Sequence, residues 1–258
     1  MKGDGWWEYR ELLYFLTWRE IKVRYKQTLL GALWALIQPV LSTLLFSLVF
    51  GKLAGIPSDG VPYPLFAYCG LLPWQIFTRA LSDASTSLVV NERLITKVYF
   101  PRMLVPSAAV LATVPDFLIS FAFLIVLLPF YGVVPSGALL MLPLFFFQTL
   151  LVALGAGFLL SALDVEYRDV RYTFPFLTQL WFFLSPIVYP LSMVPPGGRL
   201  ALAVNPVSGS VEGFRMALLG TAGPGWFFVS ISALSAVVMF AVGVAVFRRA
   251  ESFVADQI

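Results

Sequence analysis

Long uncharged runs alternate with short charged segments along this chain. No charged residue occurs in residues 27–51 or in residues 117–163. A helix needs about 20 apolar residues to cross a bilayer. The second run is therefore long enough for two helices, and the Pro and Gly of residues 131–137, YGVVPSG, predict the turn between them.

The complete pattern predicts an all-α integral membrane protein, a single transmembrane domain over residues 1–258. Six spans are expected because charged or Pro-rich and Gly-rich segments separate six apolar runs. The predicted spans are residues 27–51, 65–90, 103–130, 138–163, 172–190 and 225–247.

Two further segments are apolar in part but do not fit a span. Residues 1–26 carry ten charges and three Trp, which predicts an amphipathic helix in the membrane interface; a cytosolic helix packed on a partner is the alternative. Residues 191–224 are interrupted by Pro and Gly and contain Glu212 and Arg215. We expect short re-entrant or interfacial helices there.

A charged segment, residues 91–106, lies between the second and third predicted spans. Asn91 can cap a helix and Pro101 cannot continue one, which predicts a short helix over residues 92–100. Its apolar side chains share one face, and its Arg and Lys side chains point elsewhere. Such a helix either rests on lipid headgroups or couples the membrane domain to a soluble motor. The candidate partner-binding residues are Glu92, Arg93, Leu94, Ile95, Lys97, Val98 and Tyr99.

Composition supports the membrane assignment and excludes several kinds of site. The chain is 59% hydrophobic and 12% charged, with a mean hydropathy of +0.86. It has no His and a single Cys, Cys69, so the usual zinc and redox sites cannot form, and no catalytic, cofactor-binding or metal residue is predicted.

The basic residues report orientation, and no nucleic-acid partner is expected. Thirteen of the 17 Lys and Arg residues fall on the side of the predicted topology that also holds both termini. That side is therefore predicted to be cytoplasmic.

Three charged residues fall inside predicted spans. Arg79 and Asp83 lie one helical turn apart and can neutralise each other, and Asp116 is expected to face protein or water rather than lipid. Carboxylates in this setting also leave open an ion-coupled carrier.

Five motifs in order carry a family resemblance: GLLPW at residues 70–74, NERLITKVYFPR at 91–102, YRD at 167–169, SPIVYP at 185–190, and NP at 205–206. Together they resemble the permease subunit of type 2 ABC transporters that export O-antigen, capsule or teichoic acid. The family's coupling helix corresponds to residues 92–100 and its amphipathic gate helix to residues 6–26. The Arg79–Asp83 pair departs from the family pattern, which leaves any role for it in a pore open.

The resemblance implies a homodimer in a bacterial inner or plasma membrane, multi-pass, with two copies of an ATP-binding cassette subunit. The cargo would be a polysaccharide or an undecaprenyl-type lipid-linked glycan. Consistently, the chain has no G-x-x-x-x-G-K-[ST] loop, so ATP and Mg²⁺ are expected on the partner and this chain is not expected to be an enzyme.

Other functions fit parts of the sequence. An ABC exporter of another amphiphile or of a drug would share the same features. A membrane-embedded lipid-phosphate transferase could hold Mg²⁺ through Asp164, Glu166 and Asp169, although Arg168 and Arg171 interleave with these carboxylates.

Aromatic residues could line a sugar path, because flat ring faces stack on pyranose rings. For most of them lipid contact or helix packing is the alternative. The candidate channel or gate residues are Trp7, Tyr14, Trp18, Trp34, Phe145, Phe146, Trp181 and Phe182.

Overall fold

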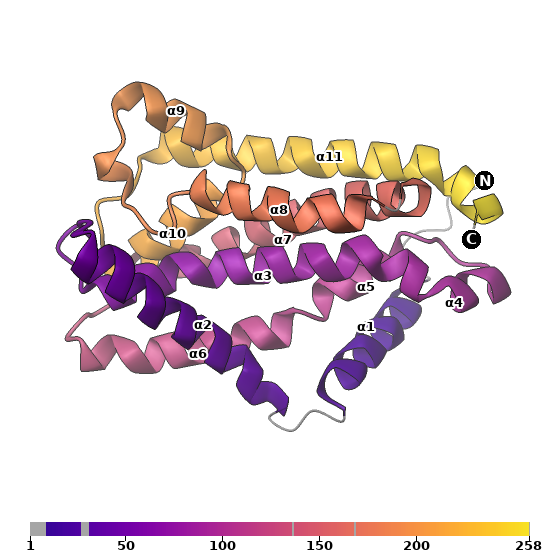
Figure 1. Ribbon diagram of the computed structural model, residues 1–258, viewed down its shortest axis with the longest axis horizontal. Helices are drawn as coiled ribbons and strands as arrows, with labels where there is room; N and C mark the ends of the chain where they lie inside the picture. Colours follow the sequence, from indigo (N-terminus) through magenta and orange to yellow (C-terminus); the bar gives the residue numbers. More distant parts are fainter. Residues whose placement is uncertain (1–8, 27–30, 136, 168, 258) are drawn as a thin grey trace.

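A computed structural model describes residues 9–26, 31–135, 137–167 and 169–257. Within these ranges every regular element is helical, and the helices form an elongated bundle (Figure 1). This confirms the predicted all-α class. Trp7 lies outside the described residues, as do residues 27–30 at the start of the first predicted span.

The central helix is α3, Tyr63–Val90, whose side chains are buried along most of its length. Pro62 and Pro64 flank its first residue, where a missing N–H costs no helical hydrogen bond. It packs against α7, Leu142–Glu166, and also contacts α2, α5, α6 and α10, whose bounds are given below. The second predicted span, residues 65–90, thus corresponds to the core of the bundle.

The first span, described from Gly31, is built from three consecutive helical pieces. They are the 3₁₀ turn η1, Gly31–Leu33, helix α2, Trp34–Phe46, and the π-helical segment η2, Ser47–Leu53. Pro39 lies within α2. Many large apolar side chains of this span are exposed, as expected for a surface that faces lipid or another protein.

The third predicted span, residues 103–130, is divided into α5, Leu104–Leu111, and α6, Val114–Phe130. Pro115 is the physical reason for the break, because it has no N–H to donate to the preceding turn. The break, at Ala112 and Thr113, lies two residues before Pro115 and three before Asp116, and it leaves backbone carbonyl groups available to other partners.

The fourth and sixth predicted spans pack closely on each other. The fourth, residues 138–163, comprises the 3₁₀ turn η3, Gly137–Met141, and α7; the sixth, residues 225–247, is part of α11, Trp226–Gln257. A Cβ added at Gly155 would lie 2.5 Å from the Cα of Phe240, and one added at Gly243 would overlap Gly155. Glycine at both positions allows the two backbones to approach.

The fifth predicted span, residues 172–190, is helical over only part of its length. Helix α8, Val170–Phe183, ends early, and non-helical chain leads to the 3₁₀ turn η4, Leu191–Met193. Two short helices follow, α9, Pro196–Val204, and α10, Ser208–Leu219. Residues 191–224 therefore contain short helices.

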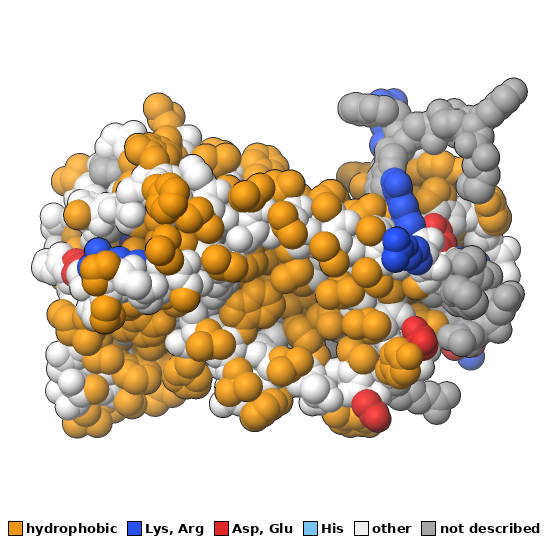
Figure 2. Space-filling view, turned by 90° about the horizontal axis from the view of Figure 1, so that it is seen from above, with side chains coloured by type: hydrophobic (Ala, Val, Ile, Leu, Met, Phe, Trp, Pro, Cys, Tyr) orange, Lys and Arg blue, Asp and Glu red, His pale blue; other side chains and the backbone are white. Residues whose placement is uncertain are grey.

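Four segments are long and apolar enough to cross a membrane among the residues described: Gly31–Leu53, Leu104–Phe130, Gly137–Glu166 and Trp226–Glu251. Helices α3 and α8 run alongside them (Figure 1). In the view of Figure 2, hydrophobic side chains cover the middle of the molecule and charged side chains gather toward its two ends. This distribution is that of a protein embedded in a bilayer.

Candidate functional site

Helices from distant parts of the sequence converge at one end of the bundle. Helix α1, Arg10–Tyr25, and helix α4, Glu92–Lys97, lie there together with the C-terminal end of α11 (Figure 1). The short helices α9 and α10 lie at the opposite end. The predicted coupling segment and the amphipathic helix are therefore neighbours.

Helix α4 is shorter than the predicted range of residues 92–100, because the backbone is extended at Val98. Asn91 precedes the helix, but its side chain does not cap it. Instead the Asn91 amide donates to the carbonyl of Ser87 at 2.8 Å, and its oxygen accepts a hydrogen bond from Arg19 of α1. Asn91 thus joins α1 to the end of α3.

The predicted apolar face of α4 is divided between the protein core and the surface. Ile95 is buried with Leu16 and Leu88, and Leu94 packs partly against the same cluster. Val98 is half-exposed and Tyr99 is 88% exposed. Of the predicted partner-binding residues, Ile95 therefore anchors α4 to its own chain, whereas Tyr99 projects outward.

The charged residues of the predicted spans lie in a network that includes a residue the sequence did not suggest. Arg24 of α1 forms ion pairs with Asp83 at 2.5 Å and with Asp116 at 2.6 Å. It also donates to the carbonyl of Ala112 at 2.9 Å, one of the groups at the break between α5 and α6. Arg79 contacts Asp83 as predicted, at 3.3 Å, but Arg24 is closer.

Asp116 has a second partner from α1. Its other carboxylate oxygen accepts a hydrogen bond from the Tyr25 hydroxyl. Burial, together with this hydrogen bond to Asp116, raises the pKa of Tyr25 to about 12, so the hydroxyl stays a donor at neutral pH. Asp116 therefore faces protein, and α1 is fixed to α3 and α6 by charged groups.

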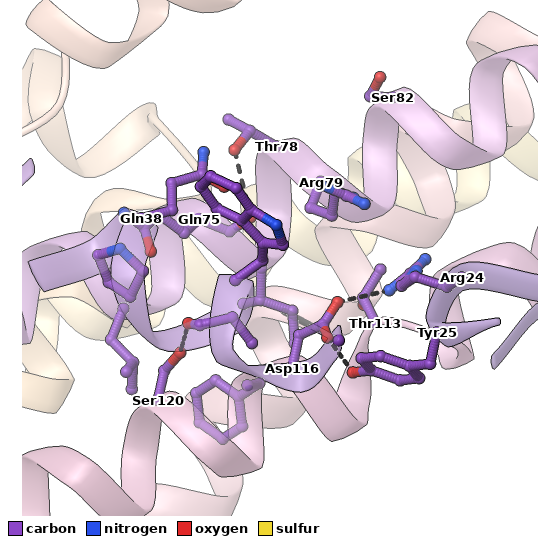
Figure 3. A pocket seen from close by; sticks show the side chains of 17 residues that line it. Arg24, Tyr25, Gln38, Gln75, Thr78, Arg79, Ser82, Thr113, Asp116 and Ser120 are labelled. Carbon is purple, nitrogen blue, oxygen red and sulfur yellow. Dashed lines mark hydrogen bonds and ion pairs between the residues drawn. The ribbon is translucent and has the colours of Figure 1, made fainter. Parts of the chain in front are cut away.

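These residues border a cavity of about 540 Å³ between α1, α2, α3 and α6 (Figure 3). Its wall combines charged, amide and hydroxyl groups with apolar side chains. The labelled side chains include Gln38, Gln75, Thr78, Arg79 and Ser82. Trp34, one of the candidate aromatic residues, also lines it and is largely exposed.

The opposite end of the bundle is held by a buried arginine that the sequence reading placed only in a re-entrant region. Arg215 of α10 is fully buried, pairs with Glu212 at 2.7 Å, and donates to the carbonyl groups of Pro186 and Ile187. A Cβ added at Gly70 would lie 2.6 Å from its guanidinium group. The GLLPW and SPIVYP motifs therefore meet at this arginine.

The NP motif completes this structural network. The Asn205 side chain accepts a hydrogen bond from Trp181 at 2.9 Å and donates to Ser185 at 2.8 Å. Ser232 of α11 donates to the carbonyl of Asn205 at 3.0 Å. These contacts connect α8, the loop before α10, and α11.

The polar segment after α7 is also held by an ion pair. Both oxygens of the buried Asp164 accept hydrogen bonds from Arg171, at 2.7 and 2.9 Å. Within the described part of the chain, no group of three or more acidic or Cys side chains is arranged to hold a metal ion. Asp164 is thus occupied by Arg171 rather than turned toward Glu166 and Asp169.

The aromatic candidates differ in their surroundings. Phe145 is fully buried against Gly213, Phe146 packs on Phe117, and Phe182 is buried against Phe46 and Trp74. In this conformation they pack the subunit and do not line an open path. Tyr14 and Trp18 of α1 are exposed.

The bundle, its apolar surface and its two polar ends define a helical integral membrane subunit. The chain belongs to the ABC-2 type transporter family, whose model matches residues 11–219.

The chain is similar over nearly its whole length to named export proteins. It is 30% identical to the O-antigen export system permease protein RfbA of Myxococcus xanthus, over 96% of this chain and 95% of that protein. It is 27% identical to the RfbA protein of Klebsiella pneumoniae, over 93% and 92%. It is 23% identical to the polysialic acid transport protein KpsM of Escherichia coli, over 90% and 91%.

Proposed function

We propose that this chain is the channel-forming permease half of an ATP-driven exporter that moves a long or lipid-linked polysaccharide out of the cytosol. The observation that carries the proposal is the full-length similarity to O-antigen and polysialic acid export proteins, within a family match that covers most of the chain. An exporter of another amphiphile or a drug fits the fold equally but has no support from these relatives.

In the proposed topology six helices cross a bacterial inner membrane, and both termini and α4 are cytoplasmic. Two features support it. The excess of Lys and Arg falls on that side, and α4 shares one end of the bundle with α1 and the end of α11. Helices α9 and α10 would then lie near the outer surface.

We further propose that α4 and the exposed residues after it contact an ATP-binding cassette subunit. Tyr99 is exposed and Val98 half-exposed at the proposed cytoplasmic end, and Ile95 fixes the base of the segment in a core that α1, α3 and α11 share. Movement of a bound motor would therefore be transmitted directly to three helices. ATP and Mg²⁺ would be held by that motor subunit.

A homodimer, with two motor subunits, is the proposed assembly. The apolar faces of α2 and α8 support it, because both helices are much less buried than α3. Exposed side chains on α8 include Tyr172, Phe176 and Phe183. A second copy could cover these faces and form the translocation path between the two subunits.

The proposal is tested by deleting the gene for this chain in its own host. The expected result is loss of a surface polysaccharide together with accumulation of the same glycan, attached to lipid, inside the cell. Re-expression of the chain should restore export. Unchanged surface glycan, with altered resistance to drugs or other amphiphiles, would instead favour the alternative cargo.

A further inference from the structure

The cavity between α1, α2, α3 and α6 has polar groups to which the proposed function assigns no ligand. Its volume of about 540 Å³ can accommodate a group larger than a few water molecules. It is bordered by Arg24, Tyr25 and Asp116 on one side and by Gln38 and Gln75 on the other, and Arg79 also lines it (Figure 3).

The acidic groups beside this cavity are already engaged. Asp116 accepts from Arg24 through one oxygen and from Tyr25 through the other. Asp83 accepts from Arg24 at 2.5 Å and from Arg79 at 3.3 Å. Arg24 in turn uses both terminal nitrogens on the two carboxylates. A cationic ligand would have to displace these ion pairs.

The groups that remain available are mainly donors. Arg79 is half-exposed, and among the residues that the structure describes only its Nε has a hydrogen-bond partner. Its two terminal nitrogens are therefore available at the cavity. Within the described residues, the side-chain amides of Gln38 and Gln75 likewise make no hydrogen bond. By contrast, the Thr78 hydroxyl donates to the carbonyl of Trp74.

We propose that this cavity binds the phosphate group of a membrane lipid, and that Arg79 is its main cationic contact. The planar guanidinium edge fits phosphate oxygens through paired hydrogen bonds, which an ammonium group cannot reproduce. The amides of Gln38 and Gln75 supply further donors. The two arginines and two aspartates of the cluster cancel in formal charge, so directed hydrogen bonds provide the selectivity for the anion.

A lipid is favoured over free phosphate because the cavity continues into an apolar surface. Its wall includes Leu72, Ile76 and Phe117. On α2, Gln38 is followed at helical spacing by the exposed Leu41 and Leu45, which form a stripe on the same face. A hydrocarbon chain can lie along this stripe while its phosphate occupies the cavity.

The inference does not depend on the proposed export function, because a phospholipid of the bilayer and the lipid anchor of a glycan share this phosphate chemistry. The test uses the full chain in nanodiscs of phosphatidylcholine. Phosphatidylglycerol, a polyprenyl diphosphate, and inorganic diphosphate are titrated separately, and bound ligand is counted by native mass spectrometry.

The expected result is saturable binding of at least one of the two anionic lipids, weakened at least about tenfold by Arg79→Gln. Arg79→Lys should recover only part of the affinity. Arg248→Gln is the matched control, since it removes the same charge at an exposed position near the end of α11, and it should bind like the wild type. The lipid that binds more tightly identifies the source of the phosphate.

A second variant guards against misfolding of the first. Gln38→Leu with Gln75→Leu leaves every charge in place and should weaken the same lipid severalfold. The proposal is overturned if both variants, folded as judged by elution and melting, bind both lipids like the wild type. It is also overturned if inorganic diphosphate binds as tightly as the lipids, or if Arg248→Gln is as damaging as Arg79→Gln.

Discussion

Replacing Arg24 with Gln tests the role of the charged network that attaches α1 to the bundle. The substitution keeps a polar side chain but removes the charge that Asp83 and Asp116 share. Both carboxylates would then remain largely buried without a strong cationic partner, apart from the longer contact between Arg79 and Asp83.

The size of the effect follows from the burial of the three side chains. Breaking a fully buried ion pair costs about 3–5 kcal/mol, whereas an exposed pair is worth about 0–1 kcal/mol. The exposed fractions of the side chains are 14% for Arg24, 29% for Asp83 and 23% for Asp116. These ion pairs therefore lie between the two limits and nearer the buried one. We therefore expect Arg24→Gln to lower the free energy of unfolding by about 2–3 kcal/mol.

The assay is a mutant cycle in detergent, with unfolding followed by titration with a denaturing surfactant. Its members are the wild type, Arg24→Gln, the double variant Asp83→Asn with Asp116→Asn, and the triple variant. Each partial variant leaves a largely buried charge unpaired, whereas the triple variant leaves only the half-exposed Arg79 without its carboxylate partner. The triple variant should therefore be more stable than the sum of the separate losses predicts, by about 1 kcal/mol or more.

Additive losses, within about 0.5 kcal/mol, would refute this reasoning, because they would mean that Arg24 does not interact energetically with the two carboxylates. A loss below about 0.5 kcal/mol for Arg24→Gln would also refute it. Crosslinking between cysteines placed on α1 and α3 gives an independent reading, and the crosslink should weaken in Arg24→Gln and recover in the triple variant.

Three further predictions concern other parts of the molecule. Leu94→Ala with Tyr99→Ala should leave membrane insertion intact but weaken binding of the ATPase subunit by about 2 kcal/mol or more and abolish export. Full complex formation and stimulated ATP hydrolysis in this variant would show that α4 does not couple the permease to the ATPase. Gly70→Ala should lower the free energy of unfolding by about 1–3 kcal/mol because its Cβ would crowd Arg215. Gly137→Ala is the control, since its Cβ would meet nothing within 4 Å. Equal melting temperatures for the two variants would contradict the close packing of Gly70 on Arg215. A cysteine at Gly197 should react with an impermeant reagent in intact cells, and one in α4 should react only after permeabilisation. The buried Cys69 should not react in either case. The reverse labelling would contradict the proposed topology.

The helices could be predicted from the sequence because membrane spans need long uncharged runs, and these runs dominate the chain. The predicted boundaries differ most from the observed ones where a proline or a tertiary contact ends a helix. Pro115 divides the third span, and α8 ends at Phe183 because Pro186 has no N–H with which to continue the helix. The carbonyl groups of Pro186 and Ile187 then bond to Arg215. Such long-range partners leave no pattern in a single sequence.

The charged network shows the same limit. The spacing of Arg79 and Asp83 correctly indicated their contact, since residues four apart share a helix face. Arg24 was missed because it is 59 residues from Asp83 and 92 from Asp116, and its place on α1 gave no reason to separate it from the other basic residues of that helix. Only the break before Asp116, marked by Pro115, could have suggested an unusual site.

The coupling segment could be located but not described in detail. Residues 92–100 were predicted as one helix with one apolar face, and the cap at Asn91 and the stop at Pro101 supported this. In the structure Ile95 packs in the core shared with α1, and the helix ends at Lys97, which leaves Tyr99 outside the helix. Helical periodicity cannot distinguish a face that binds a partner from one that binds its own chain.

The most direct test of the central proposal is transport by purified components. The permease and the ATP-binding subunit encoded in the same host would be reconstituted together in vesicles with the host's lipid-linked polysaccharide. We predict that glycan crosses to the far side of the membrane only when both subunits and ATP are present. Glycan movement that needs no ATPase subunit, or that follows an ion gradient instead of ATP, would contradict the account.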